Sequence, residues 1–170
     1  MNVKHEELTV RALYDLSYTA ARPLLEACTY PWEALPKIGE FIKALGKTLS
    51  PEEYEQRGED VWVAKSAKLY PNVYIAGPTI IGPETEVRPG AFIRGNALIG
   101  AGCVVGNSTE LKNVVLFNKV QVPHYNYVGD SILGYKAHMG AGSITSNVKS
   151  DKKLVVVKDG RERIETGLKK

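Results

Sequence analysis

Residues 75–105 read IAGPTIIGPETEVRPGAFIRGNALIGAGCVV, and an aliphatic residue stands at every sixth position of this stretch. The same period extends on both sides, with two steps of five residues beyond Leu111. An internal period of this kind is typical of a repeat protein, in which each repeat stacks on its neighbours. The whole aliphatic column is Val63, Leu69, Ile75, Ile81, Val87, Ile93, Ile99, Val105, Leu111, Leu116, Val122, Val128, Leu133 and Met139.

A second column lies four residues after the first, and its members are small or β-branched. They are Ala67, Val73, Thr79, Thr85, Ala91, Ala97, Cys103, Thr109 and Val115. The two columns predict a triangular coil with three short strands and roughly 18 residues per turn, both columns pointing inward. Glycine often follows the aliphatic residue and is expected to relieve the backbone at the bends. A β-sandwich would alternate every two residues, so the six-residue period excludes it.

A helical period precedes the repeat. Its apolar stripe is formed by Ile38, Phe41, Ile42, Leu45 and Leu49. We expect an earlier helix over Thr9–Arg22 and a further helix start at Ser50–Glu53, which offers an N-cap followed by proline. The N-terminal helices are expected to form an α-helical cap over the open end of the coil, because bare strand edges invite aggregation.

The period ends after Val148, and residues 152–158 and 161–166 then predict a hairpin with a turn at Asp159-Gly160. The expected organisation is a helical segment over 1–58, the β-helix over 59–148, and a projecting hairpin and tail over 149–170. No capping helix follows the hairpin, so either a further coil or a partner is expected to cover this end.

Composition narrows the function classes. The formal net charge of +3 is too small to indicate nucleic acid or membrane binding, and no apolar run is long enough to span a bilayer. Cys28 and Cys103 lie far apart and have no ligand-spaced neighbours, so we expect reduced thiols in a cytoplasmic protein and no metal site. His5 lies in a polar stretch and is expected to be exposed to solvent.

Three segments carry chemistry: VGNSTELKN (105–113), VPHYNYVGD (122–130) and MGAGSITSN (139–147). In sequence and spacing they resemble the acetyltransferase domain of the bifunctional N-acetylglucosamine-1-phosphate uridyltransferase/glucosamine-1-phosphate acetyltransferase, within the hexapeptide-repeat acyltransferase superfamily. The resemblance covers about residues 61–153. It implies a mainly β chain with a left-handed parallel β-helix, acetyl-CoA as the acyl donor, and a homotrimer with active sites between neighbours.

The resemblance also implies roles for individual residues. His124 matches the general base that takes a proton from the sugar amine, a task suited to imidazole near neutral pH. The cations that match the family's phosphate-binding positions are Arg88, Lys112 and Lys153. The remaining substrate-binding matches are Tyr127, Asn147 and His138, the last of which stands where the family has asparagine. The tyrosine that follows the family's asparagine is replaced by Val148.

Two functions from different classes are compatible with these residues. The first is an acyl-CoA-dependent transferase acting on an amino-sugar phosphate or a nucleotide sugar, with no uridylyltransferase activity, because no glycine-rich phosphate loop precedes a helix. The alternative is a non-catalytic trimeric scaffold or sugar-nucleotide-binding protein, because the family's later coils that contact the donor are missing. A β-helical carbonic anhydrase is excluded, since only His124 and His138 lie on the coil and zinc would need three histidines. The run Val114–Phe117 is expected to be an exposed face that supports the trimer.

Overall fold

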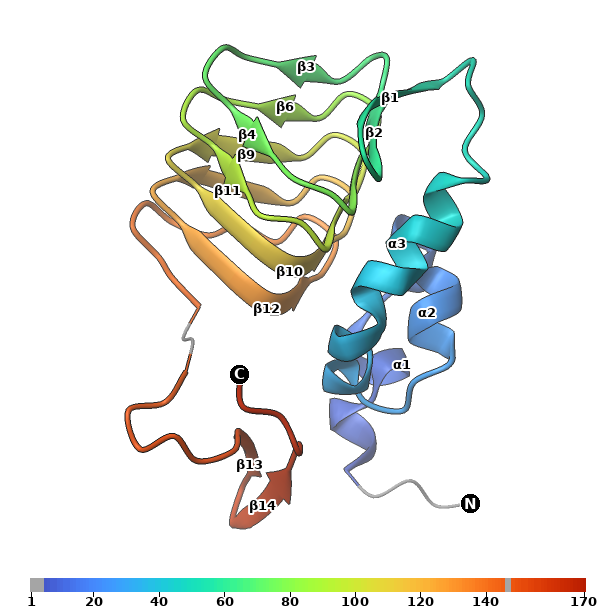
Figure 1. Ribbon diagram of the computed structural model, residues 1–170. Helices are drawn as coiled ribbons and strands as arrows, with labels where there is room; N and C mark the ends of the chain where they lie inside the picture. The colour runs from blue at the N-terminus through green and yellow to red at the C-terminus, as the bar shows by residue number, and fades with distance from the viewer. Residues whose placement is uncertain (1–4, 146–147) are drawn as a thin grey trace.

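The computed structural model describes residues 5–145 and 148–170, and its largest part is a three-sided parallel β-helix (Figure 1). Its strands are β2 (Val61–Ala64), β3 (Lys68–Leu69), β4 (Tyr74–Ile75), β5 (Thr79–Ile81), β6 (Glu86–Val87), β7 (Phe92–Ile93), β8 (Ala97–Ile99), β9 (Val104–Asn107), β10 (Glu110–Leu116), β11 (Gln121–His124) and β12 (Tyr127–Leu133). The helices are η1 (Glu6–Leu8), α1 (Val10–Leu13), η2 (Leu16–Tyr18), α2 (Arg22–Glu26), η3 (Pro31–Glu33), η4 (Leu35–Lys37) and α3 (Ile38–Gly46).

Each turn of the β-helix places one strand on each of three faces. Face A contains β2, β5, β8 and the second halves of β10 and β12; face B contains β3, β6, β9 and β11. Face C contains β4, β7 and the first halves of β10 and β12. Successive turns on face A pair Val61, Thr79, Ala97, Val114 and Ser131 in parallel register. The register therefore advances by one turn after 18 residues, and after 17 where a five-residue step occurs.

The interior confirms the predicted β-helix. The aliphatic column is fully buried from Ile81 to Val128, and only its members in the end turns are partly exposed. The hydroxyls of Thr79, Thr85 and Thr109 have no exposed surface and donate to backbone carbonyls at 2.7, 2.7 and 2.9 Å. These bonds satisfy the polar atom, so threonine fits the second column as well as alanine does.

Glycine after the aliphatic residue serves close stacking of the coils rather than the bends. A Cβ on Gly82 would lie 2.7 Å from the carbonyl carbon of Gly100, and one on Gly100 would lie 2.7 Å from the backbone nitrogen of Asn118. The positive φ values that turn the chain occur elsewhere, at residues such as Asn96 and Ser108. The expectation that these glycines relieve the bends is therefore wrong.

The N-terminal helices cover a side of the prism. The outward positions of face A form an apolar row, with Trp62 7%, Ile80 2%, Leu98 2% and Val115 0% exposed. The helix α3 contacts β5, β8 and β10, and its Gly46 lies against the Trp62 ring. Figure 1 shows the helices beside the stacked strands. The expected cap over an open end is corrected to a cover on face A, because that row of large apolar side chains requires burial.

The run Val114–Phe117 is not an exposed face. All four side chains have no exposed surface, and the Tyr14 ring packs against Phe117 at 5.3 Å between centroids. The five-residue step places Val114 in register with Ala97, so Val115 points outward toward the helices and not into the core. These residues therefore give no support to a trimer.

Two helix predictions at the N-terminal side are also corrected. Thr9–Arg22 contains only α1 and η2, and α2 begins at Arg22 with Pro23 in its first turn, where proline is tolerated. Ser50–Glu53 forms a turn that leads into β1 (Tyr54–Gly58), which pairs antiparallel with β2. The face A edge of the first coil is thereby covered by a strand.

The C-terminal segment forms a hairpin of β13 (Val156–Asp159) and β14 (Glu162–Glu165). This hairpin reaches the N-terminal segment, where it receives the His5 side chain, which is only 9% exposed and hydrogen-bonds Asp159 at 2.7 Å. The expectation of a solvent-exposed His5 is therefore wrong. Among the described residues, no helix has both the length and the apolar character required to cross a bilayer.

Candidate active site

His124 ends β11 at the corner between face B and face C, with its imidazole exposed. Its backbone N–H donates to Oδ1 of Asn126 at 3.1 Å, and its carbonyl accepts from Gly142 at 3.0 Å. Tyr125, between them, has a φ of 50°, which turns the chain onto face C. Within the described residues, no side chain hydrogen-bonds the His124 imidazole, which leaves a ring nitrogen available to accept a proton.

Asn126 fixes this corner. It is 2% exposed, and its Nδ2 donates to the carbonyls of Gly140 at 2.8 Å and Ser143 at 3.0 Å in the following coil. Its backbone N–H also faces Thr109 Oγ1 at 3.5 Å. One buried amide thus holds both the His124 backbone and the loop of residues 140–143 in place. The sequence analysis did not select Asn126. Its position could have indicated the role, because a polar side chain that points inward at a corner needs hydrogen-bond partners.

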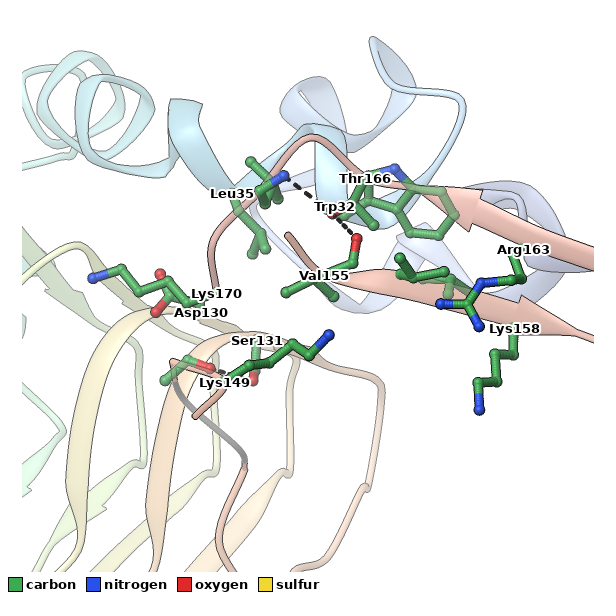
Figure 2. Close-up of a pocket in the computed structure, with 14 residues that line it drawn as sticks. Trp32, Leu35, Asp130, Ser131, Lys149, Val155, Lys158, Arg163, Thr166 and Lys170 are labelled. Carbon is green, nitrogen blue, oxygen red and sulfur yellow. Dashed lines mark hydrogen bonds between the residues drawn. The ribbon is translucent and has the colours of Figure 1, made fainter. Parts of the chain in front are cut away.

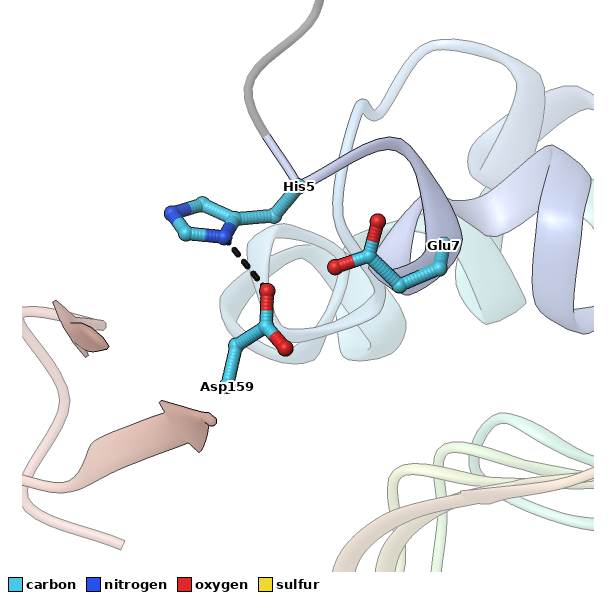
Figure 3. Close-up of side chains that lie close together, drawn as sticks. All are labelled: His5, Glu7 and Asp159. Atoms are coloured by element: carbon cyan, nitrogen blue, oxygen red, sulfur yellow. Dashed lines mark hydrogen bonds and ion pairs between the residues drawn. The ribbon is translucent and has the colours of Figure 1, made fainter. Parts of the chain in front are cut away.

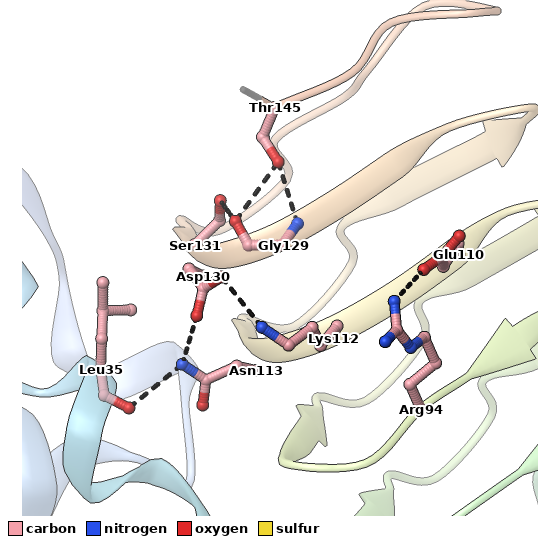
Figure 4. Close-up of polar contacts among 9 residues, drawn as sticks. All are labelled: Leu35, Arg94, Glu110, Lys112, Asn113, Gly129, Asp130, Ser131 and Thr145. Carbon is pink, nitrogen blue, oxygen red and sulfur yellow. Dashed lines mark hydrogen bonds and ion pairs between the residues drawn. The ribbon is translucent and has the colours of Figure 1, made fainter. Parts of the chain in front are cut away.

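Lys112 lies on face C beside an acidic partner. Its Nζ is 3.3 Å from Oδ2 of Asp130, whose other oxygen accepts from Asn113 Nδ2 at 2.8 Å (Figure 4). Asn113 also donates to the Leu35 carbonyl at 3.2 Å, which joins the N-terminal segment to the coil. The Asp130 side chain is 10% exposed, so the ion pair is set into the surface rather than free in solvent.

A second lysine adjoins this pair. Burial lowers the pKa of Lys112, but the contacts with Lys170 and then Asp130 outweigh it and hold that pKa above the ordinary lysine value. The hydrogen bond and the repulsion from Lys112 lower the pKa of Lys170. Two amines therefore face each other beside one carboxylate, an arrangement that favours a bound anion.

A pocket of about 560 Å³ opens beside Lys170 and beside Asp130, the partner of Lys112 (Figure 2). One wall comes from the corner at Asp130 and Ser131, the second from Trp32 and Leu35, and the third from the C-terminal hairpin. Its lining combines apolar surface with basic side chains: Lys149, Lys158, Arg163 and Lys170. A pocket with this lining suits an anion that carries an apolar or aromatic portion.

Arg94, which the motif comparison did not select, lies on the same face as Lys112. It precedes Lys112 by one turn, its N–H donates to the Leu111 carbonyl at 2.9 Å, and its Nη1 lies 2.7 Å from Oε1 of Glu110. Arg88, the predicted phosphate ligand, instead follows β6 on face B and pairs with Glu86 at 3.1 Å. The structure therefore brings Arg94, and not Arg88, to the face of Lys112.

Tyr127 is the first residue of β12. It lies along the chain between His124 and Gly129, and Gly129 pairs in register with Lys112. Its ring folds back over Gly129, so that a Cβ there would lie 2.7 Å from Cζ. The phenol is close enough to Lys112 to influence the lysine pKa. Of the predicted site residues, Tyr127 and Lys112 share face C, and His124 lies at its edge.

His138 and Lys153 do not join this group. His138 is exposed on face B, where its Nδ1 faces Gln121 Oε1 at 3.1 Å. Lys153 is exposed after the last coil, with its backbone N–H bonded to Asp151 at 3.0 Å. Asn147 lies outside the described residues.

Comparison of this chain with known proteins identifies several relatives. Residues 75–160, about half of the chain, match the family described as the GMPPB C-terminal domain. The bifunctional protein GlmU of Methanococcus aeolicus is 37% identical over 117 residues, which cover 58% of this chain and 28% of that protein. GlmU of Methanococcus maripaludis strain C5 is 34% identical over 130 residues, covering 75% and 32% respectively.

The chain thus spans about a third or less of the length of these curated relatives. Among solved structures, the acetyltransferase domain of PglB from Neisseria gonorrhoeae FA1090 superposes with a TM-score of 0.34 and 12% identity. That superposition covers 61% of this chain and 57% of the PglB domain.

Proposed function

The chain belongs to the family of the GMPPB C-terminal domain, and we propose that it is an acyl-CoA-dependent transferase, with acetyl-CoA as donor and an amino-sugar phosphate or nucleotide sugar as acceptor. The observation that carries this proposal is the arrangement on face C, where an exposed imidazole, a phenol and a cluster of cations follow one another. The similarity to relatives named GlmU supports acetyl transfer as the reaction class.

His124 acts as the general base. The acceptor amine attacks the thioester carbonyl carbon, a carbon–nitrogen bond forms, the carbon–sulfur bond breaks, and coenzyme A leaves as the thiol. The proton lost by the amine is taken up at an imidazole nitrogen of His124, which is exposed to solvent, and passes from there to the departing sulfur, so that coenzyme A leaves as the thiol. This general-base step typically contributes 10²–10⁴-fold to rate.

The acceptor phosphate binds at the cations of face C. Lys112 and Lys170 repel each other, and a phosphate between them replaces that repulsion with two charge-assisted bonds. Arg94 adds a planar guanidinium one coil away, which suits bidentate contact with phosphate oxygens. Tyr127, between the cations and His124, contacts the sugar.

A scaffold function is the second candidate, and one specific observation favours it. Both coil cations of the site already have a carboxylate partner: Arg94 with Glu110, and Lys112 with Asp130. A substrate phosphate must compete with these carboxylates, which weakens anion binding. The scaffold function predicts that no acyl-CoA supports turnover.

Activity of the native gene product with acetyl-CoA and a panel of amino-sugar phosphates separates the two functions. In the enzyme, His124→Ala lowers kcat by about 10²–10⁴-fold, and melting changes little because the side chain is exposed. His124→Asn keeps the polarity and removes the base, so it should behave like His124→Ala. Lys65→Ala, an exposed charge on the first coil, is the control. Equal turnover by His124→Ala and wild type would exclude His124 as the base.

Assembly as a homotrimer remains part of the proposal. A catalytic imidazole is usually oriented by a second group, and none of the described residues hydrogen-bonds the His124 ring. A neighbouring copy at the corner of faces B and C would supply that group. Light scattering at micromolar concentration tests this point, and a monomer would argue against a shared site.

A further inference from the structure

The N-terminal segment meets the C-terminal hairpin through a cluster of one histidine and three carboxylates. His5 Nδ1 lies 2.7 Å from Asp159 Oδ2, and its Nε2 lies 3.0 Å from Glu162 Oε2. One ligand atom each of His5, Glu7 and Asp159 lies within 4.8 Å of the others, and Figure 3 shows the three side chains converging. This cluster is separate from face C and plays no part in the proposed acyl transfer.

The negative charge of the cluster favours a bound cation. Glu7 and Asp159 place two carboxylates beside one imidazole, and Glu162 places a third on the other side of the ring. Even a protonated His5 would leave the three carboxylates in excess, whereas a divalent ion between Glu7 and Asp159 would balance them.

We propose that His5, Glu7 and Asp159 form a binding site for a first-row divalent cation, for which Zn²⁺ is the best fit. Zinc takes imidazole nitrogen and carboxylate oxygen at about 2.0–2.2 Å, and three protein ligands leave one position for water. His5 Nδ1 is the nitrogen ligand because it faces Asp159, and the 9% exposure of the ring shields the metal–nitrogen bond.

Glu162 completes the arrangement from the other side of the ring. It accepts from Nε2, and a carboxylate on the far nitrogen of a metal-bound histidine fixes the tautomer and raises the basicity of the ligand. The metal would fasten the hairpin, which also lines the pocket at Asp130 and Lys170, to the N-terminal segment.

Titration of the full, chelator-treated chain with ZnCl₂ in a calorimeter tests the site. We expect one saturable zinc per wild-type chain, loss of that transition in His5→Ala and Asp159→Asn, and affinity lowered about 10–100-fold in Glu162→Gln. Glu165→Gln removes a charge from the same strand outside the cluster and should bind zinc as wild type does. The Co²⁺-loaded wild type should show visible d–d absorption that His5→Ala lacks.

Melting curves without metal show whether each variant keeps the β-helix, which is expected because His5 lies outside it. With zinc, the melting temperature should rise in wild type and in Glu165→Gln but not in His5→Ala, because only a binding-competent native state is stabilised by ligand. Absence of saturable zinc binding by wild type overturns the proposal, and so does unchanged binding by His5→Ala.

Discussion

Arg94 lies one turn before Lys112 on the same face of the β-helix, with its backbone N–H bonded to the Leu111 carbonyl at 2.9 Å. Their separation of 18 residues equals one turn, whereas Arg88 precedes Lys112 by 24 residues, or one turn and a third. An extra third of a turn moves a residue to the next face of the triangle. The Arg-Pro-Gly motif therefore carries Arg88 away from the cations that it was predicted to join.

Substitution of Arg88 and Arg94 in turn tests which of the two binds the acceptor phosphate, Arg88 as the motif predicts or Arg94 as the geometry indicates. If Arg94 contacts the acceptor phosphate, Arg94→Ala should raise KM about tenfold or more, because a hydrogen bond to a charged group contributes about 1.5–3 kcal/mol. Arg88→Ala should leave KM near the wild-type value. Steady-state kinetics with varied acceptor measures both. A rise in KM confined to Arg88→Ala would restore the motif-based assignment.

The architecture could be predicted because the interior repeats. A side chain that points inward at Ile81 must be followed by another at Val87 and Ile93, so burial imposes the six-residue period on the sequence. The five-residue steps limit that prediction. After such a step the inward corner position falls to Val114, and Val115 turns outward under the helices, which simple counting from Leu111 does not reveal.

The site could be predicted only in part, for two physical reasons. Motif matching identifies residue types and local spacing, as it did for His124, Tyr127 and Lys112, but the face is set by distance along the coil. Asp130 and Lys170 act through contacts between segments, and His5 meets Asp159 across 154 positions of sequence. No periodicity connects such pairs, because the segments outside the repeat have no register with it.

A methyl group at Gly129 should disturb the site without unfolding the coil. A Cβ there would lie 2.7 Å from Cζ of the Tyr127 ring, so Gly129→Ala must displace the phenol from its place beside Lys112. We expect acceptor KM to rise several-fold and stability to fall by about 1–3 kcal/mol, as for overpacking. Kinetics and urea denaturation measure the two effects. Tyr127→Phe is the control, because it keeps the ring and should retain stability. A KM for the acceptor in Gly129→Ala that equals the wild-type value would show that Tyr127 is not needed in that position.

Removal of the Asn126 amide should weaken the fold around the candidate base. Asn126→Ala leaves the His124 N–H and the Ser143 carbonyl without this partner and leaves the Gly140 carbonyl with the Ser143 N–H alone, and polar groups left unsatisfied away from water cost about 1–3 kcal/mol. We expect the free energy of unfolding to fall by about 2–3 kcal/mol. Asn107→Ala, which loses one exposed bond to the Pro89 carbonyl and a long one of 3.4 Å from the Ser108 hydroxyl, is the control and should cost about 1 kcal/mol or less. Equal losses in the two variants would contradict a central role for Asn126.

The buried Cys103 thiol should make stability fall at high pH. Burial raises its pKa from 9.0 to about 11, and its Sγ donates to the Phe117 carbonyl at 3.1 Å. Above pH 9 the unfolded chain loses this proton while the folded chain keeps it, so the unfolded state is favoured until the folded thiol also ionises near pH 11. A pKa difference of this size between the folded and unfolded chains corresponds to about 2–3 kcal/mol of unfolding free energy.

Comparison with Cys103→Ala isolates this thiol from the other groups that titrate at high pH. The informative quantity is the difference in unfolding free energy between wild type and the variant, measured by urea denaturation across the pH range. The variant loses packing at neutral pH, by about 1–2 kcal/mol for a small core cavity, but it lacks the titrating group. Wild type should therefore be the more stable at pH 7, and its advantage should shrink and then reverse as the pH rises from 9 to 11. A difference that stays constant over that range would show that the thiol ionises alike in both states.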